Sequence, residues 1–188
     1  MGKFEEINLT GLKKYSIKDR PSKVHIKDFA KPSAIRNFLS GLPDILAGKD
    51  FKELIDKCVI AHKNNKPVIV ALGGHVVKCG LSLYIIEMIE TGLIKALASN
   101  GSVVIHDFEI AEFGKTSEYV ASALEDGSFG MAEETCDGIN NIIKKAAEEK
   151  LGYGEAIGKH LVESNAPNNN FSLLASAYKN NIPFTVHV

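Results

Sequence analysis

Tryptophan is absent from this sequence of 188 residues, and aromatic residues make up only 7% of it. Neither charge sign dominates, because 22 Lys and Arg stand against 23 Asp and Glu. The chain as a whole therefore has no electrostatic reason to bind nucleic acid or an anionic membrane. No apolar run is long enough to span a bilayer. The polar start Met1–Glu6 lacks the apolar core of a signal peptide, and the odd number of widely spaced cysteines predicts a protein of the reducing cytoplasm.

Motifs for several kinds of site are missing as well. The three cysteines, Cys58, Cys79 and Cys136, form no C-x-x-C pair, which disfavours a disulfide scaffold or a zinc knuckle and favours small buried side chains. The sequence holds no Walker A loop, no G-x-G-x-x-G, no H-E-x-x-H and no G-x-S-x-G. A functional site must therefore be sought in less regular patterns.

Hydrophobic residues make up 45% of the chain, enough for the core of one domain. A β-branched run at 68–72 predicts a strand buried on both faces, and Gly73-Gly74 follows it directly. A helix over about 80–91, ended by Gly92, leads to a second strand at 93–98 and a helix containing 103–113. This order predicts an α/β fold, a Rossmann-like parallel sheet flanked by helices.

The remaining segments are predicted from weaker patterns. Residues 1–50 form an N-terminal extension with a short edge strand in 23–29 and a helix capped by Ser33, and 67–188 form the core. Further expected elements are a helix from Asp50 to Asn64 with one apolar stripe, mainly helical structure at 115–165, a helix at 171–179 and a strand at 182–188. Because the sequence ends inside that strand, we expect a fragment or truncated product.

The turn after the first core strand is the first candidate site. Gly73 and Gly74 let the backbone approach a ligand, and the helix that follows offers free N–H groups to an anion. His75 can act as an acid or base, and Lys78 can hold a carboxylate or phosphate. A tight strand-to-helix turn with an exposed His and Lys is the alternative interpretation.

The turn after the second core strand is the next candidate. Asn100 and Gly101 form a sharp turn, and Ser102 can cap the helix. His106 and Asp107 suit proton transfer, although adjacent residues point about 100° apart on a helix. His106 and Glu109 lie one turn apart and can share a face. Ordinary surface polarity is the competing interpretation.

Three weaker patterns complete the candidates. His75, His106 and His187 could meet at one sheet edge in a three-histidine zinc site. Cys79 lies near a helix start that could lower its pKa, although burial is the more frequent explanation. The glycines at 152, 154 and 158 favour close helix packing, for which a subunit contact is one place, over ligand binding.

The candidate turns also carry a family resemblance. The sequence resembles the deoxyhypusine synthase family, more exactly its divergent prokaryotic relatives of unassigned activity. The matching segments are Gly73–Lys78, Leu97–Gly101, His106–Ala111, Phe113–Ser117, Asn170–Ser172 and Ala177–Pro183. The resemblance implies a Rossmann-like sheet, an NAD pocket at the strand ends and a homo-oligomer, with tetramers typical of the family.

The sequence departs from the family at its chemistry. The family's catalytic lysine belongs to a segment after Val188, and Lys78 does not match it. His106 and Asp107 stand where the family has an acidic pair, so aminobutyl transfer from spermidine is not expected. The leading hypothesis is a deoxyhypusine synthase-like protein that binds NAD or another small anionic ligand, with His106 as general base. The alternatives are a non-catalytic binding or assembly protein and a metal-assisted hydrolase that uses the three histidines.

Overall fold

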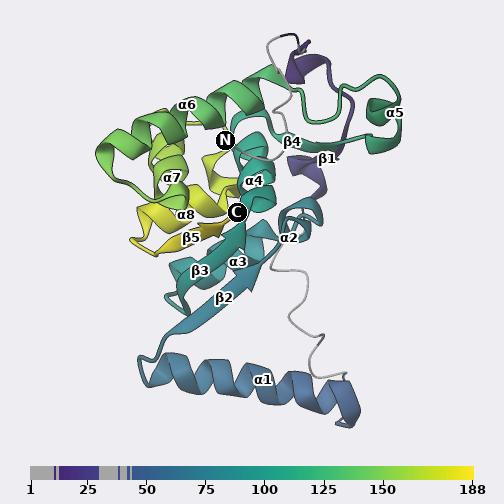
Figure 1. Cartoon of the computed structure of the whole chain (residues 1–188). Coiled ribbons are helices and arrows are strands. Elements are labelled where there is room, and N and C mark those ends of the chain that lie inside the picture. The colour runs from purple at the N-terminus through teal and green to yellow at the C-terminus, as the bar shows by residue number, and fades with distance from the viewer. Residues whose placement is uncertain (1–10, 12, 30–37, 39–41, 43) are drawn as a thin grey trace, which may run out of the picture.

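The computed structural model describes residues 11, 13–29, 38, 42 and 44–188 (Figure 1). The helix predicted from Ser33 lies outside the described residues. The strands are β1 Ser22–His25, β2 Val68–Leu72, β3 Ile94–Asn100, β4 Lys115–Glu118 and β5 Phe184–His187. The α-helices are α1 Leu46–Lys63, α2 His75–Lys78, α3 Ser82–Glu90, α4 Gly101–Phe113, α5 Val120–Glu125, α6 Glu133–Glu149, α7 Tyr153–Glu163 and α8 Leu173–Lys179. Short 3-10 turns cover Ile17–Asp19, Ile26–Asp28 and Asn169–Phe171.

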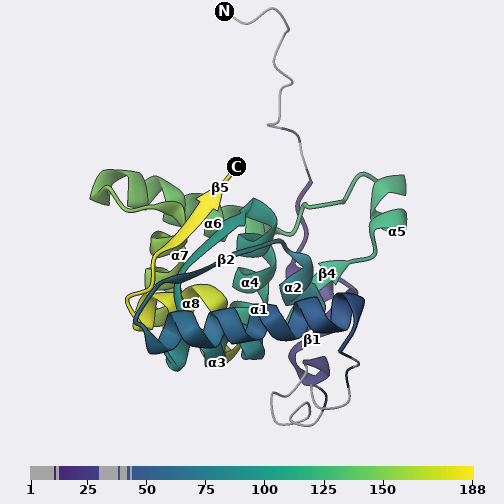
Figure 2. The same ribbon diagram turned by 90° about the horizontal axis from the view of Figure 1, so that it is seen from below.

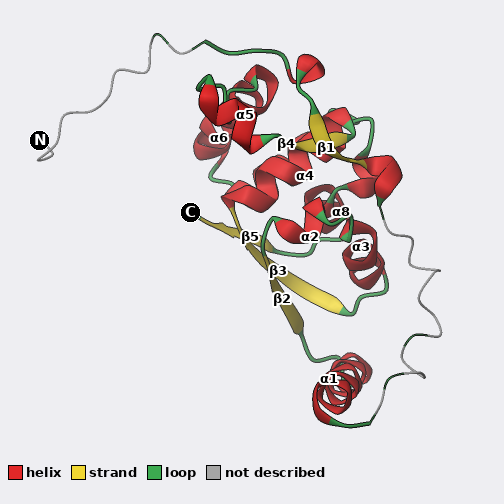
Figure 3. Cartoon of the chain, turned by 90° about the vertical axis from the view of Figure 1, so that its right-hand side faces the viewer, coloured by secondary structure: helices red, strands yellow, loops and turns green. Residues whose placement is uncertain are grey.

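The centre of the fold is a parallel sheet with the strand order β2-β3-β5. Leu72 pairs with Ser99, and Asn100 pairs with His187, so the three strands end at one edge. The connections between the strands are helical, and Figure 3 shows α2, α3, α4 and α8 beside the sheet. The prediction of an α/β fold with a parallel sheet flanked by helices is confirmed.

The strand β2 is not buried on both faces, contrary to the sequence prediction. Val70 and Leu72 pack against the core, whereas Ile69, just before them, is 65% exposed, and Ala71 between them is exposed as well. The core helices cover only one face of the sheet at β2 (Figure 3), so alternate side chains point away from them. A continuous apolar run does not tell a strand covered on one face from a strand covered on two.

The helix α1 also differs from the prediction. It begins at Leu46 rather than at Asp50, after the uncapped Ile45. None of its residues is buried, and in its apolar stripe Phe51 is 44% and Leu54 is 57% exposed. Figure 1 shows α1 apart from the other helices, beyond β2. The periodicity located the helix correctly but did not tell what it packs against.

The helix predicted over about 80–91 is confirmed as α3, and the single turn α2, which was not predicted, precedes it. The single turn α2 ends at Lys78, and Gly80 adopts a φ of 71° before α3 begins at Ser82. A positive φ suits glycine and stops a helix, so the break lies where the sequence holds this residue. Gly92, with a φ of 73°, follows the end of α3 as predicted.

A small antiparallel sheet joins the N-terminal part of the chain to the core. β1 pairs with β4, with Val24 opposite Thr116. The edge strand expected in 23–29 is therefore confirmed over its first part, whereas β4 lies in a region expected to be mainly helical. The left-handed residue Gly114, with a φ of 65°, ends α4 and starts this strand. We call residues 13–29 the N-terminal strap, because they pass along β4 and α6.

The long excursion after β4 returns through α7 and α8 to β5. α5 lies on the opposite side of α4 from α7 (Figure 2). Two glycines allow the close packing on the α7 side: a Cβ on Gly158 would lie 2.5 Å from the carbonyl oxygen of Leu174, and one on Gly154 would overlap that of Phe184. The interpretation as packing residues is confirmed for Gly154 and Gly158 within the chain, whereas Gly152 has open space around it. Among the described helices, none is long and apolar enough to cross a membrane.

The glycine contact between α7 and β5 gives a stability prediction. A Gly154→Ala substitution should lower the free energy of unfolding by about 1–3 kcal/mol, because the added methyl meets rigid backbone. Gly152→Ala is the control, since a Cβ there has open space around it. Urea unfolding of both variants is the measurement. Equal stability of the two variants would contradict the packing role.

Candidate functional site

A cleft of about 480 Å³ lies beside the first half of α4, close to the carboxyl edge of the parallel sheet. One face of α4 forms a wall, and α2, β4 and α6 contribute the others. Its charged and polar lining includes Arg20, Lys78, Ser102, His106, Glu109 and Glu118. Its apolar lining includes Ile105, Val120, Phe129, Ile139 and Ile143. A pocket of this size and mixed lining suits a small molecule.

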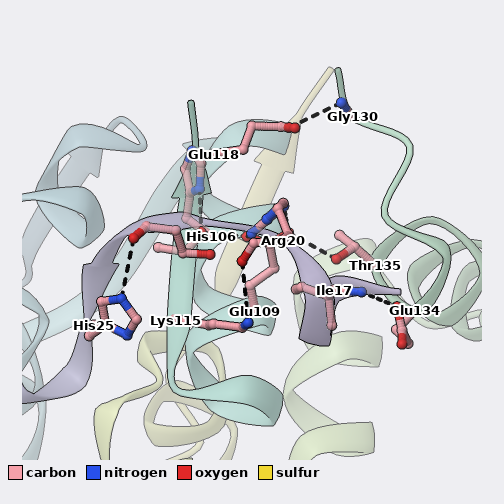
Figure 4. Close-up of polar contacts among 12 residues, drawn as sticks. Ile17, Arg20, His25, His106, Glu109, Lys115, Glu118, Gly130, Glu134 and Thr135 are labelled. Carbon is pink, nitrogen blue, oxygen red and sulfur yellow. Dashed lines mark hydrogen bonds and ion pairs between the residues drawn. The ribbon is translucent and has the colours of Figure 1, made fainter. Parts of the chain in front are cut away.

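A buried ion pair forms the base of this cleft (Figure 4). The Arg20 guanidinium donates to both carboxylate oxygens of Glu109, Nη1 to Oε1 over 2.9 Å and Nη2 to Oε2 over 2.8 Å. The two side chains are only 5% and 2% exposed. A bidentate pair of this kind fixes orientation as well as distance. It connects the N-terminal strap to α4 across 89 residues of sequence.

Two threonine hydroxyls complete the surroundings of Glu109. Thr135 Oγ1 donates to Oε1 over 2.8 Å, and Thr116 Oγ1 donates to Oε2 over 2.5 Å. Each carboxylate oxygen therefore accepts two hydrogen bonds, which offset the cost of removing the charge from water. The hydrogen bonding of Arg20 is less complete, because its buried Nε has no partner among the described residues.

His106 lies one turn before Glu109 and shares its face of α4, as the spacing predicted. Its Nδ1 is 2.8 Å from Thr116 Oγ1. Its Nε2 has no hydrogen-bond partner among the described residues, and the ring lines the cleft. Of the three proposed catalytic residues, His106 is the one whose side chain borders this cavity.

Asp107 lies elsewhere. It is fully buried, and its carboxylate accepts hydrogen bonds from Ser172 Oγ and from the backbone N–H groups of Leu173 and Leu174. Burial raises its pKa to about 6, although these hydrogen bonds favour the charged form. The expectation that Asp107 and His106 share a site is not met, because neighbouring residues on a helix point apart. Asp107 instead holds the first turn of α8 against α4.

The turn Gly73-Gly74, just before α2, packs closely beside the cleft. A Cβ on Gly74 would lie 2.7 Å from Ser102 Oγ and 3.1 Å from His106 Cδ2, so this residue must be small. Gly73 has open space around it. Lys78 lines the cleft and forms no ion pair with a described residue. His75 is exposed and lies outside the cleft lining, although its charge, when present, is felt by His106.

The turn after β3 differs in detail from the prediction. α4 begins at Gly101, and Asn100 occupies the cap position without a side-chain cap bond. Ser102 is inside the helix and donates to Asn100 Oδ1 over 2.7 Å, so it does not cap. Asn100 and Gly101 stand at the end of β3, beside the cleft rather than in its lining.

The metal hypothesis does not fit the described residues. His187 contacts Thr185 Oγ1 over 3.0 Å, and no group of three His, Cys, Asp or Glu side chains in the described part of the chain could hold a metal ion. The three-histidine hydrolase is therefore not proposed. Cys79 is exposed rather than buried, whereas Cys58 and Cys136 are half-buried.

Several residues in or next to the cleft were not predicted as site residues from the sequence. Arg20 stands among mixed charges in the sequence, Thr116 lies in the segment Phe113–Ser117 of the family resemblance without a predicted role, and Thr135 belongs to no motif. Their common role, bonding to Glu109, depends on contacts between distant parts of the chain. The one local signal was the helical spacing of His106 and Glu109, which predicted that they share a face of α4.

Comparisons with known proteins give no function. No protein-family model and no curated protein matches the chain. Among solved structures, the apo structure of ArgZ, an arginine dihydrolase from the ornithine-ammonia cycle in cyanobacteria, is similar with a TM-score of 0.49 and 15% identity. The match covers 71% of this chain but only 17% of that chain. The resemblance to deoxyhypusine synthases stays a prediction.

The buried pair gives a second stability prediction. Glu109→Gln should lower the free energy of unfolding by about 3 kcal/mol, because it leaves the Arg20 guanidinium buried without its counter-charge. Glu112→Gln on the same helix is the control, since its contact with His160 spans 4.0 Å near the surface, and should change stability by less than about 0.5 kcal/mol. Chemical denaturation compares them. A Glu109→Gln variant as stable as the control would contradict the structural role of the pair.

Proposed function

We propose that this chain binds a small anionic ligand, NAD or a related nucleotide, in the cleft at the carboxyl edge of the parallel sheet. The observation that carries the proposal is the position of Lys78 and His106. Both line one cavity next to the ends of β2 and β3, where ligands of open parallel sheets bind. The proposal concerns binding, and it holds for an enzyme and for a non-catalytic binding protein alike.

The charges of the cleft favour an anion at the α2 end. The charge of Arg20 is matched by Glu109, whereas Lys78 has no anionic partner among the described residues. Glu118 belongs to β4 rather than to the α2 end of the cleft, and it accepts hydrogen bonds from Tyr15 Oη and the Gly130 N–H. At the N-terminus of α4, the Asn100 side chain makes no cap bond, so the first N–H groups of the helix near Ser102 keep no side-chain cap from this residue and favour an anion. A phosphate or carboxylate next to Lys78 would meet favourable charge.

The apolar half of the cleft suits the rest of such a ligand. Ile105 of α4, Ile139 and Ile143 of α6, and Phe129 line the cavity. These side chains can cover a planar ring, which has apolar faces and polar edges. The residues proposed for the cofactor are therefore Lys78 and Ser102 in the cleft, with Gly73, Gly74, Asn100 and Gly101 shaping the turns beside it.

Isothermal titration calorimetry with NAD and ADP-ribose tests the proposal. Lys78→Gln should weaken binding about 10- to 100-fold, because a hydrogen bond to a charged group is worth about 1.5–3 kcal/mol. Lys66→Gln, on the exposed turn before β2, should leave the affinity unchanged. Failure of both ligands to bind at millimolar concentration, or equal binding by the two variants, would contradict the proposal.

A further inference from the structure

A continuous chain of hydrogen bonds connects the buried ion pair to the cleft. It runs from the Arg20 guanidinium to Glu109, from Glu109 to Thr116 Oγ1, and from Thr116 Oγ1 to His106 Nδ1. His106 is the last member, and its ring borders the cavity. Thr116 is fully buried and does not line the cleft, so it can affect a ligand only through His106.

The protons of this chain can be assigned from its chemistry. Glu109, paired with Arg20, is a carboxylate and only accepts hydrogen bonds. The Thr116 hydroxyl has one proton, and it uses that proton to donate a hydrogen bond to Glu109 Oε2 over 2.5 Å. In the hydrogen bond between Thr116 and His106, the ring must then be the donor and the hydroxyl oxygen the acceptor, so Nδ1 carries the hydrogen. In a neutral ring this leaves Nε2 as an acceptor.

The surroundings keep the ring neutral. Burial is the main cause that lowers the pKa of His106 to about 4, and Lys78 and His75 of α2 and Arg20 of the N-terminal strap lower it further. Glu109 acts in the opposite direction, but its charge is matched by Arg20. At neutral pH a ligand therefore meets an unprotonated Nε2. A base with so low a pKa is a weak proton acceptor, and the hydrogen-bonding role is favoured over general-base catalysis.

We propose that Glu109 and Thr116 are positioning residues that hold His106 as its Nδ1–H tautomer, so that Nε2 accepts a hydrogen bond from the ligand. The ligand class follows from this acceptor and from Lys78 in the same cleft: an anion that also carries an O–H or N–H donor, such as a sugar phosphate or the ribose phosphate part of a nucleotide. The tautomer stands on the contacts of His106 alone, whereas the ligand class rests on the proposed function.

Nitrogen NMR of the ligand-free protein tests the positioning role. Protonated and unprotonated imidazole nitrogens have well-separated ¹⁵N shifts, so the tautomer of His106 is read directly. We expect Nδ1–H in the wild type and in Thr116→Ser, which keeps the hydroxyl. Thr116→Val, of nearly equal volume, should give a mixture or the Nε2–H form. An Nε2–H ring in the wild type, or no change in Thr116→Val, would overturn the positioning role.

The pH profile in the same experiment separates this role from mere structural support. The folded pKa of about 4 lies below the ordinary value of 6.5, so the His106 shifts should stay constant from neutral pH down to about pH 5. Titration near pH 6.5 would place the ring in water and contradict the assignment. Its neighbours His75, Lys78, Arg20 and Glu109 are unchanged in both Thr116 variants, so any difference between them reports the hydroxyl.

Calorimetry with NAD on the same three proteins tests the ligand class. Thr116→Val should bind NAD about 3- to 10-fold more weakly than wild type, and Thr116→Ser should restore the affinity. NAD that binds the wild type and Thr116→Val equally would overturn the ligand class and leave the proposed function intact. No binding of NAD to the wild type would overturn the proposed function and the ligand class together, while the NMR result decides the tautomer on its own.

Discussion

The buried pair of Arg20 and Glu109 is the constraint on which the cleft depends. It fixes the N-terminal strap against α4, and β1 can then pair with β4 beside it. Buried ion pairs often add little net stability compared with apolar residues, but removing one partner is costly. The pair therefore acts here mainly to specify one arrangement of the strap, α4 and α6. His106 obtains its orientation from that arrangement through Thr116.

Helix α4 carries two buried carboxylates with different tasks. Glu109 faces the strap and the cleft, and its four hydrogen bonds come from Arg20, Thr116 and Thr135. Asp107 faces the other way and holds the start of α8. The helix thus connects the packing of α7, α8 and β5 with the geometry of the cleft, while its apolar residues fill the core between them.

Local patterns predicted the central sheet well, because the strands at 68–72 and 94–100 and their glycine turns are encoded by adjacent residues. The shared face of His106 and Glu109 followed from helical spacing in the same way. Other features depend on partners distant in sequence. Arg20 meets Glu109 across 89 residues, β4 exists because β1 pairs with it, and Asp107 is buried because α8 packs there. No local signal distinguishes Asp107 from His106 as a site residue, and none shows that the stripe of α1 stays exposed.

A double-mutant cycle between Arg20→Met and Glu109→Gln measures the central constraint most directly. Each single variant leaves one buried charge without its partner, whereas in the double variant neither charge remains. Each single variant should lower the free energy of unfolding. The structure predicts that the decrease in the double variant is smaller than the sum of the two single decreases by at least about 1 kcal/mol. Additive losses, within about 0.5 kcal/mol, would show that the two residues act independently and would contradict a cleft built on their contact.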